Sequence, residues 1–94
     1  MSAYIIAAIE VSDADDYATY AAQTVALAEA AGGTFLVKGG AQSFVEGEGA
    51  SRHVVIRFPS VAAARAWYDS PEYQAILPVA LRASARSIVI VEGM

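Results

Sequence analysis

The sequence has no cysteine and only one histidine, His53. The first absence excludes disulfide bonds, thiolate catalysis and cysteine-bound metals, and the second excludes a histidine-rich metal site within one chain. Basic residues are also few. Six lysines and arginines stand against ten acidic residues, which gives a net charge of -4 and an isoelectric point near 4.7. The basic surface that is typical of a nucleic-acid-binding protein is therefore missing.

Long apolar runs are missing as well, because glycine, serine and tyrosine interrupt the uncharged stretches. None provides the ~20 consecutive apolar residues that a membrane-spanning helix needs. The apolar segment Ala3–Ile9 has no basic start and is followed by Glu10, so it lacks the pattern of a secretory signal. We therefore predict a cytoplasmic protein with neither a membrane nor a nucleic acid as partner.

The composition is that of a chain that folds around a core. Of its 94 residues, 56% are hydrophobic and only 17% are charged, whereas about 45–50% and about 25% are usual. Such a chain buries enough apolar surface to offset its ordering entropy. The length predicts a single domain over residues 1–94.

The hydrophobic pattern predicts strand, helix, strand, strand, helix, strand. The predicted strands are Tyr4–Val11, Phe35–Lys38, His53–Phe58 and Ser87–Glu92, and the predicted helices follow Asp13 and Ser60. Asp13 and Ser60 are good N-cap residues, and Gly32-Gly33 ends the first helix near Ala31. The second helix ends near Asp69.

Two connections are less regular. Ser70-Pro71 predicts a short helical segment that runs to about Leu77, and Pro78–Ala85 is predicted as a further helical turn or a loop. Gln42–Gly49 is predicted as a loop that contains a short extended piece at Ser43–Glu46. The whole order is that of an α+β, ferredoxin-like βαββαβ sandwich, in which helices cover one face of an antiparallel sheet.

Apolar residues lie on both faces of the first and last predicted strands. On the first strand one face is wholly apolar and the other is mixed, the latter holding Tyr4, Ile6, Ala8 and Glu10. Strands that are apolar on both faces are usually covered on both. A chain of this size buries only about 60–65% of its surface alone. We therefore infer a homodimer that packs sheet to sheet around a barrel-like interior.

Several segments resemble the family called domain of unknown function 1330. The matching segments cover nearly the whole chain and are Asp13–Tyr20, Ala30–Gly40, Val45–Gly47, Phe58–Gln74 and Ile88–Gly93. The stretch from Phe58-Pro59-Ser60 to Ser70-Pro71-Glu72-Tyr73-Gln74 is the most specific. The resemblance implies a dimeric alpha+beta barrel of ferredoxin-like protomers. Its superfamily includes cofactor-free monooxygenases of antibiotic biosynthesis, muconolactone isomerases, heme-degrading enzymes and plain dimeric binding proteins.

The first and third strands are the central pair of this fold. If their mixed faces point away from the helices, Glu10, His53 and Arg57 converge on a cavity on the dimer side. There His53 is a candidate general base and Arg57 a candidate clamp for an anion. The alternative is a buried ion pair and a hydrogen-bonded histidine at the dimer seam.

Three further residues are candidates for binding a ligand. Tyr4 lies on the same mixed face. Tyr20 is expected to project its hydroxyl into the space between helix and sheet. Arg82, with Arg86, precedes the last predicted strand and either holds a ligand carboxylate at the pocket entrance or lies on a solvent-facing helix.

Two functions remain open. The first is a cofactor-independent enzyme that acts on a small apolar or aromatic metabolite in an apolar pocket with a few polar groups. The second is a non-catalytic dimeric module that binds a small ligand or a partner protein. No cofactor and no metal are predicted, and a heme-handling role lacks support because only His53 is available as an axial ligand.

Overall fold

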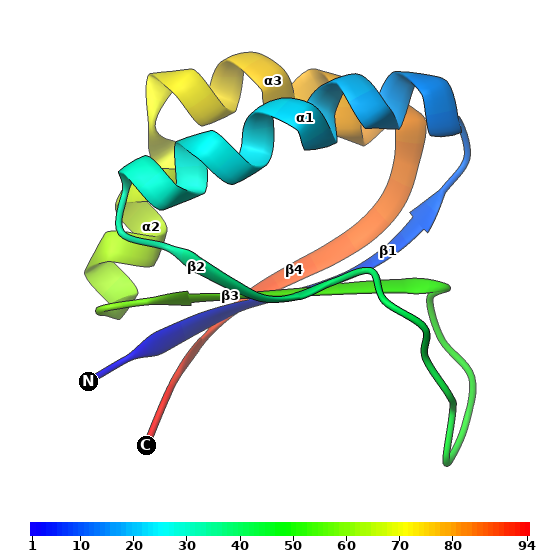
Figure 1. Cartoon of the computed structure of the whole chain (residues 1–94), viewed down its shortest axis with the longest axis horizontal. Coiled ribbons are helices and arrows are strands. Elements are labelled where there is room, and N and C mark those ends of the chain that lie inside the picture. The colour runs from blue at the N-terminus through cyan, green and yellow to red at the C-terminus, as the bar shows by residue number, and fades with distance from the viewer.

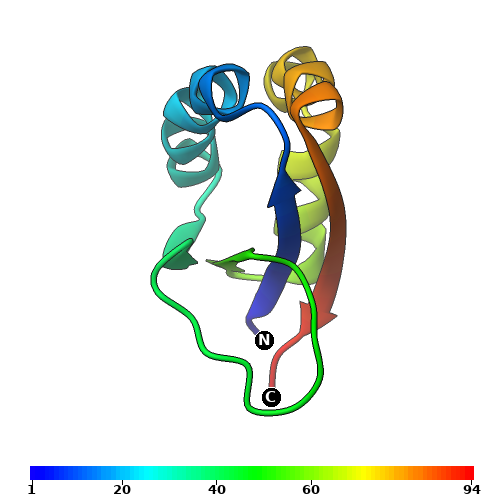
Figure 2. The same cartoon turned by 90° about the vertical axis from the view of Figure 1, so that its right-hand side faces the viewer.

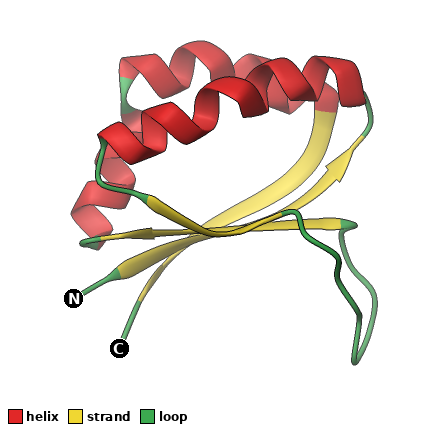
Figure 3. Ribbon diagram, in the orientation of Figure 1, coloured by secondary structure: helices red, strands yellow, loops and turns green.

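The computed structural model describes residues 1–94 as two layers, with all helices on one face of a four-stranded sheet (Figure 1, Figure 3). The strands are β1 (Ala3–Val11), β2 (Thr34–Lys38), β3 (Arg52–Phe58) and β4 (Ser84–Glu92), and the helices are α1 (Ala14–Ala30), α2 (Val61–Asp69) and α3 (Pro71–Ala83). All neighbouring strands are antiparallel, in the order β2-β3-β1-β4. This confirms the ferredoxin-like sandwich and its central pair, β1 and β3.

Side chains that accept backbone hydrogen bonds set the starts of the helices. The Asp13 carboxylate accepts from the Asp16 N–H at 3.0 Å, and the Ser60 hydroxyl accepts from the Ala63 N–H at 3.0 Å. Each of these bonds satisfies a donor that has no partner inside the helix. Both caps are the predicted ones.

Alternation along the strands separates a covered face from a helix-free face. Ile5 and Ile9 are each 2% exposed beneath the helices, whereas Ile6, which points the other way, is 38% exposed. On β3, Val54 and Ile56 are likewise buried, and His53 points to the opposite face. The mixed faces of β1 and β3 therefore point away from the helices, which was the condition set for placing Glu10, His53 and Arg57 on one face.

The C-terminal helix is longer than the segment predicted to end near Leu77. α3 continues through Pro78 and ends at Ala83, so of the two alternatives for Pro78–Ala85 the helical one is observed as far as Ala83. A proline inside a helix removes one backbone hydrogen bond. Here the loss is offset because Ile76, Leu77 and Ala80 are buried against the rest of the core.

The last strand begins earlier than predicted, and the extended piece in the long loop is absent. β4 starts at Ser84 rather than Ser87, which places Arg86 inside the sheet. Ser43–Glu46 is not a strand. The loop between β2 and β3 instead projects away from the helices, on the helix-free side of the sheet (Figure 1, Figure 2). None of the three helices is both long and apolar enough to cross a bilayer.

Candidate functional site

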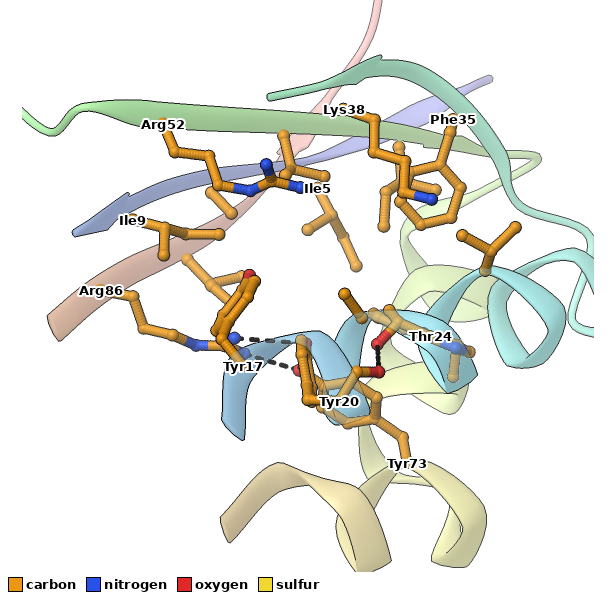
Figure 4. Close-up of a pocket in the computed structure, with 17 residues that line it drawn as sticks. Ile5, Ile9, Tyr17, Tyr20, Thr24, Phe35, Lys38, Arg52, Tyr73 and Arg86 are labelled. Carbon is orange, nitrogen blue, oxygen red and sulfur yellow. Dashed lines mark hydrogen bonds between the residues drawn. The ribbon is translucent and has the colours of Figure 1, made fainter. Parts of the chain in front are cut away.

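A cavity lies between α1 and the covered face of the sheet (Figure 4). Ile5, Ala7 and Ile9 of β1 form its floor, and Tyr17 and Tyr20 of α1 line the opposite side. Of the 17 lining residues 13 are hydrophobic. The cavity volume is about 40 Å³, in a measure in which one water needs roughly 10–15 Å³.

The only charged residues that line the cavity are three cations. Lys38, Arg52 and Arg86 come from β2, β3 and β4, and no aspartate or glutamate lines the cavity with them. Neither of the ion pairs in the chain, Arg65–Asp69 and Arg82–Asp16, involves these cations. Three of the six basic residues of an acidic protein therefore surround one apolar cavity without a counter-ion.

The sheet register sets the positions of the two arginines. Both Arg52 and Arg86 pair directly with Ile9, one on each side of β1. Residues that are directly opposite on neighbouring strands point to the same face, so both guanidinium groups are directed under α1. Lys38 pairs with Val54 in the adjoining row and is exposed, so the cavity reaches the surface at Lys38.

The Arg52 side chain lies between a glycine and an aromatic ring. Its guanidinium is 5.8 Å from the centre of the Tyr17 ring, a cation–π distance, and it passes directly over the Cα of Gly39. The Arg52 Nε is buried and has no hydrogen-bond partner. The Trp67 Nε1, on another lining residue, is also a buried donor without a partner.

Arg86 joins two tyrosines at the helix side of the cavity. It donates to the Tyr20 hydroxyl at 3.2 Å and to the Tyr73 hydroxyl at 2.6 Å, and these two hydroxyls lie 2.7 Å apart (Figure 4). Its guanidinium is also 5.2 Å from the centre of the Tyr20 ring. The three side chains come from β4, α1 and α3, so the cluster forms only in the folded chain.

Burial controls the ionisation of this cluster. It raises the pKa of Tyr73 far above that of a free tyrosine, and the neighbouring Tyr20 adds to the rise, which Arg86 only partly opposes. Burial also raises the pKa of Tyr17. For Arg86, burial disfavours the charge, but the two tyrosine oxygens together outweigh this effect and raise its pKa. At neutral pH the Arg86 cation therefore lies beside a neutral Tyr73 hydroxyl.

The residues predicted on the mixed faces all lie on the helix-free face, outside this cavity. Glu10 accepts from the Ser51 hydroxyl at 2.6 Å, and His53 Nδ1 lies 2.7 Å from the Gln42 side-chain oxygen. No hydrogen bond or ion pair joins Glu10, His53 and Arg57 to one another within one protomer. Tyr4 is on the same face, opposite Arg57 in the register.

Of the other two predicted residues, Tyr20 lines the cavity and Arg82 does not. Tyr20 does project its hydroxyl into the space between helix and sheet, as expected. Arg82 forms a bidentate pair with Asp16 at 2.6 and 2.9 Å on the surface, so its solvent-facing alternative is the one observed.

Neither arginine was among the residues predicted to face the covered side of the sheet: no signal in the sequence singled out Arg52, and Arg86 was predicted in a connection and not in a strand. The signal for Arg86 was its spacing from Ile88 and Ile90, with which it shares the covered face. No group of three or more acidic or histidine side chains in the chain is arranged to hold a metal ion.

Solved structures share this fold. A dimeric ferredoxin-like protein of unknown function from Jannaschia sp. CCS1 has a TM-score of 0.80 at 17% identity, over 99% of this chain and 100% of that chain. A protein of unknown function from Rhodopseudomonas palustris has the same TM-score and identity, over 99% of this chain and 82% of that one. SnoaB, a cofactor-independent oxygenase from Streptomyces nogalater, has a TM-score of 0.65 at 10% identity, over 99% and 93% of the two chains.

At these identities the similarity concerns the fold alone. No curated protein matches the chain. A family model, described as Domain of unknown function (DUF1330), matches residues 2–94. Because that match spans nearly the whole chain, the protein belongs to the DUF1330 family.

Proposed function

We propose that the protein is a homodimer in which each protomer binds a small apolar or aromatic anion in the cavity beneath α1. The observation that carries this proposal is the set of three cations, Lys38, Arg52 and Arg86, around an apolar cavity that has no acidic residue. A carboxylate or enolate oxygen would supply the missing negative charge, and the apolar floor would hold the hydrocarbon part.

The energetics favour an anion over a neutral ligand. A partly buried cation without a counter-ion has lost hydration and gained no Coulomb attraction in return. Arginine hydrogen bonds to a carboxylate are roughly twice as strong as bonds between neutral groups. An anion that enters the cavity therefore gains more from Arg52 and Arg86 than a neutral molecule of the same shape.

The helix-free face supports the dimer. Val89 and Val91 of β4 are 49% and 44% exposed, and Ile6 beside them in the sheet is 38% exposed. Contiguous apolar surface of this kind marks an interaction site. The structural neighbour from Jannaschia sp. CCS1 is described as dimeric. We propose that Glu10, His53 and Arg57 lie at this seam between two copies and contribute to joining them.

Three benzene derivatives of one shape test the anion proposal. Benzoate, benzamide and benzamidinium carry charges of -1, 0 and +1, and their binding is followed by two-dimensional amide NMR titration of the dimer. We expect benzoate to bind at least about tenfold more tightly than benzamide, because charge-assisted hydrogen bonds contribute roughly 1.5–3 kcal/mol, and benzamidinium not to bind.

The matched variants are Arg86→Met, which removes a cavity cation, and Arg65→Met, which removes an exposed cation paired with Asp69. Arg86→Met should abolish the preference for benzoate and Arg65→Met should leave it intact. Equal binding of benzoate and benzamide, or equal effects of the two variants, would overturn the proposal.

A second candidate is a cofactor-independent enzyme that acts on the bound metabolite. The observation that favours it is the Arg86-linked hydroxyl pair of Tyr20 and Tyr73 beside the apolar cavity. A hydroxyl next to a cation can donate its proton to the carbon of an enolate, and the tyrosinate that remains is stabilised by the cation until solvent protonates it again. Acetylacetone in deuterated water is a suitable probe. Faster deuterium exchange at its central carbon with the protein than with Tyr20→Phe supports catalysis, and equal rates leave binding as the function.

A further inference from the structure

We propose that the Tyr20 hydroxyl donates a hydrogen bond to the anionic oxygen of the ligand, with Arg86 behind it as the supporting cation. This inference rests on the proposed function and specifies the ligand chemistry: an oxyanion on a trigonal carbon, as in a carboxylate or an enolate. Tyr20 then selects for an oxygen that accepts a hydrogen bond, beyond the charge preference of the three cations.

The Arg86, Tyr20 and Tyr73 side chains hold more hydrogens than they have acceptors for among themselves. Arg86 donates one hydrogen to the Tyr20 oxygen and one to the Tyr73 oxygen. The two hydroxyls share one further hydrogen bond, at 2.7 Å, to which only one of them contributes its hydrogen. Two hydroxyl hydrogens are present, so one of them has no acceptor within the cluster. Buried donors normally have partners, so this hydrogen is available to an acceptor that enters the cavity.

Burial assigns the spare hydrogen to Tyr20. Tyr73 is 0% exposed, and the Tyr20 oxygen is the acceptor within reach of its hydroxyl. Tyr73 thus donates to Tyr20, whose oxygen then accepts from both Tyr73 and Arg86. Both tyrosines line the cavity, but Tyr20 is the more exposed of the two, at 5%, and its hydroxyl is left to donate elsewhere.

The surroundings are rich in other donors and poor in acceptors. The Arg52 Nε and the Trp67 Nε1 are both buried without partners, and both residues line the same cavity. The side-chain oxygen of Thr24 already donates to the Tyr20 carbonyl, at 2.8 Å. A ligand that only donates hydrogen bonds would leave these groups unsatisfied, whereas an oxyanion accepts from several of them at once.

The test compares Tyr20→Phe with Tyr73→Phe, which remove the two hydroxyls in turn. Both variants keep the ring, and thermal unfolding verifies that each is folded. Benzoate affinity should fall about tenfold in Tyr20→Phe, because a hydrogen bond to a charged group is lost. It should change by less than about threefold in Tyr73→Phe, because Arg86 and the Tyr20 hydroxyl remain.

A second measurement does not depend on the variants folding well. In dimer labelled with ¹³C at tyrosine Cζ, benzoate should shift the Tyr20 signal more than the Tyr73 signal. If Tyr73→Phe loses as much affinity as Tyr20→Phe, or if the Tyr73 signal moves more, the assignment to Tyr20 is overturned while the anion proposal stands. If wild-type protein does not prefer benzoate to benzamide, both proposals fall.

Discussion

Replacing Gly39 by alanine tests whether Arg52 belongs to the anion site. Gly39 follows β2 with φ +68°, and its N–H donates to the His53 carbonyl at 2.9 Å. A Cβ at this position would lie 2.0 Å from Arg52 Nη1 and 2.4 Å from Arg52 Cζ. Ordinary carbon contacts are about 3.5–4.0 Å, so the guanidinium must move by more than about 1 Å.

The substitution has two separable effects. The left-handed backbone conformation disfavours alanine by roughly 1–2 kcal/mol, which lowers the melting temperature by about 4–8 °C per kcal/mol in a chain of this size. Displacing Arg52 changes stability little, because its end is flexible and its Nε already lacks a partner. It does, however, move one of the three cations away from the cavity, so benzoate affinity should fall by about threefold to tenfold.

Gly47→Ala is the matched control, because Gly47 has φ +73° and nothing lies within 4 Å of its would-be Cβ. Both variants should show a similar drop in melting temperature, measured by circular dichroism. Only Gly39→Ala should lose benzoate affinity, measured by amide NMR titration. Unchanged benzoate affinity in Gly39→Ala would refute the assignment of Arg52 to the site, and a much larger loss of stability than in Gly47→Ala would show that Arg52 has a structural role.

Three further outcomes are expected. Val89→Asp should convert the dimer into a monomer of 9.8 kDa in light scattering, because it places a charge on the exposed apolar face; a dimer that persists contradicts the proposed seam. His53→Ala should lower the free energy of unfolding by less than about 1–2 kcal/mol in urea titrations, since within one protomer it removes one hydrogen bond, to Gln42; a larger loss would show that His53 contributes more to the proposed seam than this one bond. The hydrogen bond from Arg82 lowers the pKa of Asp16, so this pair stabilises the fold above the unfolded pKa near 3.8 and stops doing so as the pH falls through the lower folded value. Asp16→Asn should therefore melt slightly below wild type at pH 6, and the two should converge as the pH falls below the lowered pKa of Asp16. A constant difference would contradict the assignment.

The sequence predicted the layers of this fold because one face of β1 is wholly apolar, whereas the opposite face, with Tyr4 and Glu10, is mixed. Ile5, Ile9 and Val54 are buried as that pattern requires, and Ile6 is exposed on the opposite face. Register follows from such a pattern, since a shift by one residue would expose every buried side chain. The start of α1 was also predictable from the sequence. Asp13 has a short side chain that can accept a backbone hydrogen bond, and the acidic residues Asp15 and Asp16 follow it in the first turn.

The bounds of α3 and β4 could not be predicted from the sequence in the same way. Pro78 gives a strong local signal against a helix, but burial of Ile76 and Ala80 outweighs it, and no local pattern reports that burial. Because the predicted helix ended near Leu77, the last strand was predicted to start at Ser87 and not at Ser84. The direction of the Arg86 side chain was therefore not predicted. The cavity cations were missed for a related reason: an isolated arginine in a strand carries no signal until the register shows which residues face it.

The proposed ligand accounts for the charges around the cavity better than stability alone does. A chain with a net charge of -4 has enough carboxylates to pair Lys38, Arg52 and Arg86, and it does pair Arg82 with Asp16. Hydrophobic residues in place of buried charges are often neutral or stabilising. The partly buried Arg52 and Arg86 have no carboxylate partner, and Arg52 and Trp67 each have an unpartnered donor, so these groups are a poor way to stabilise a small core. The same groups suit a bound molecule that supplies one negative charge and several hydrogen-bond acceptors.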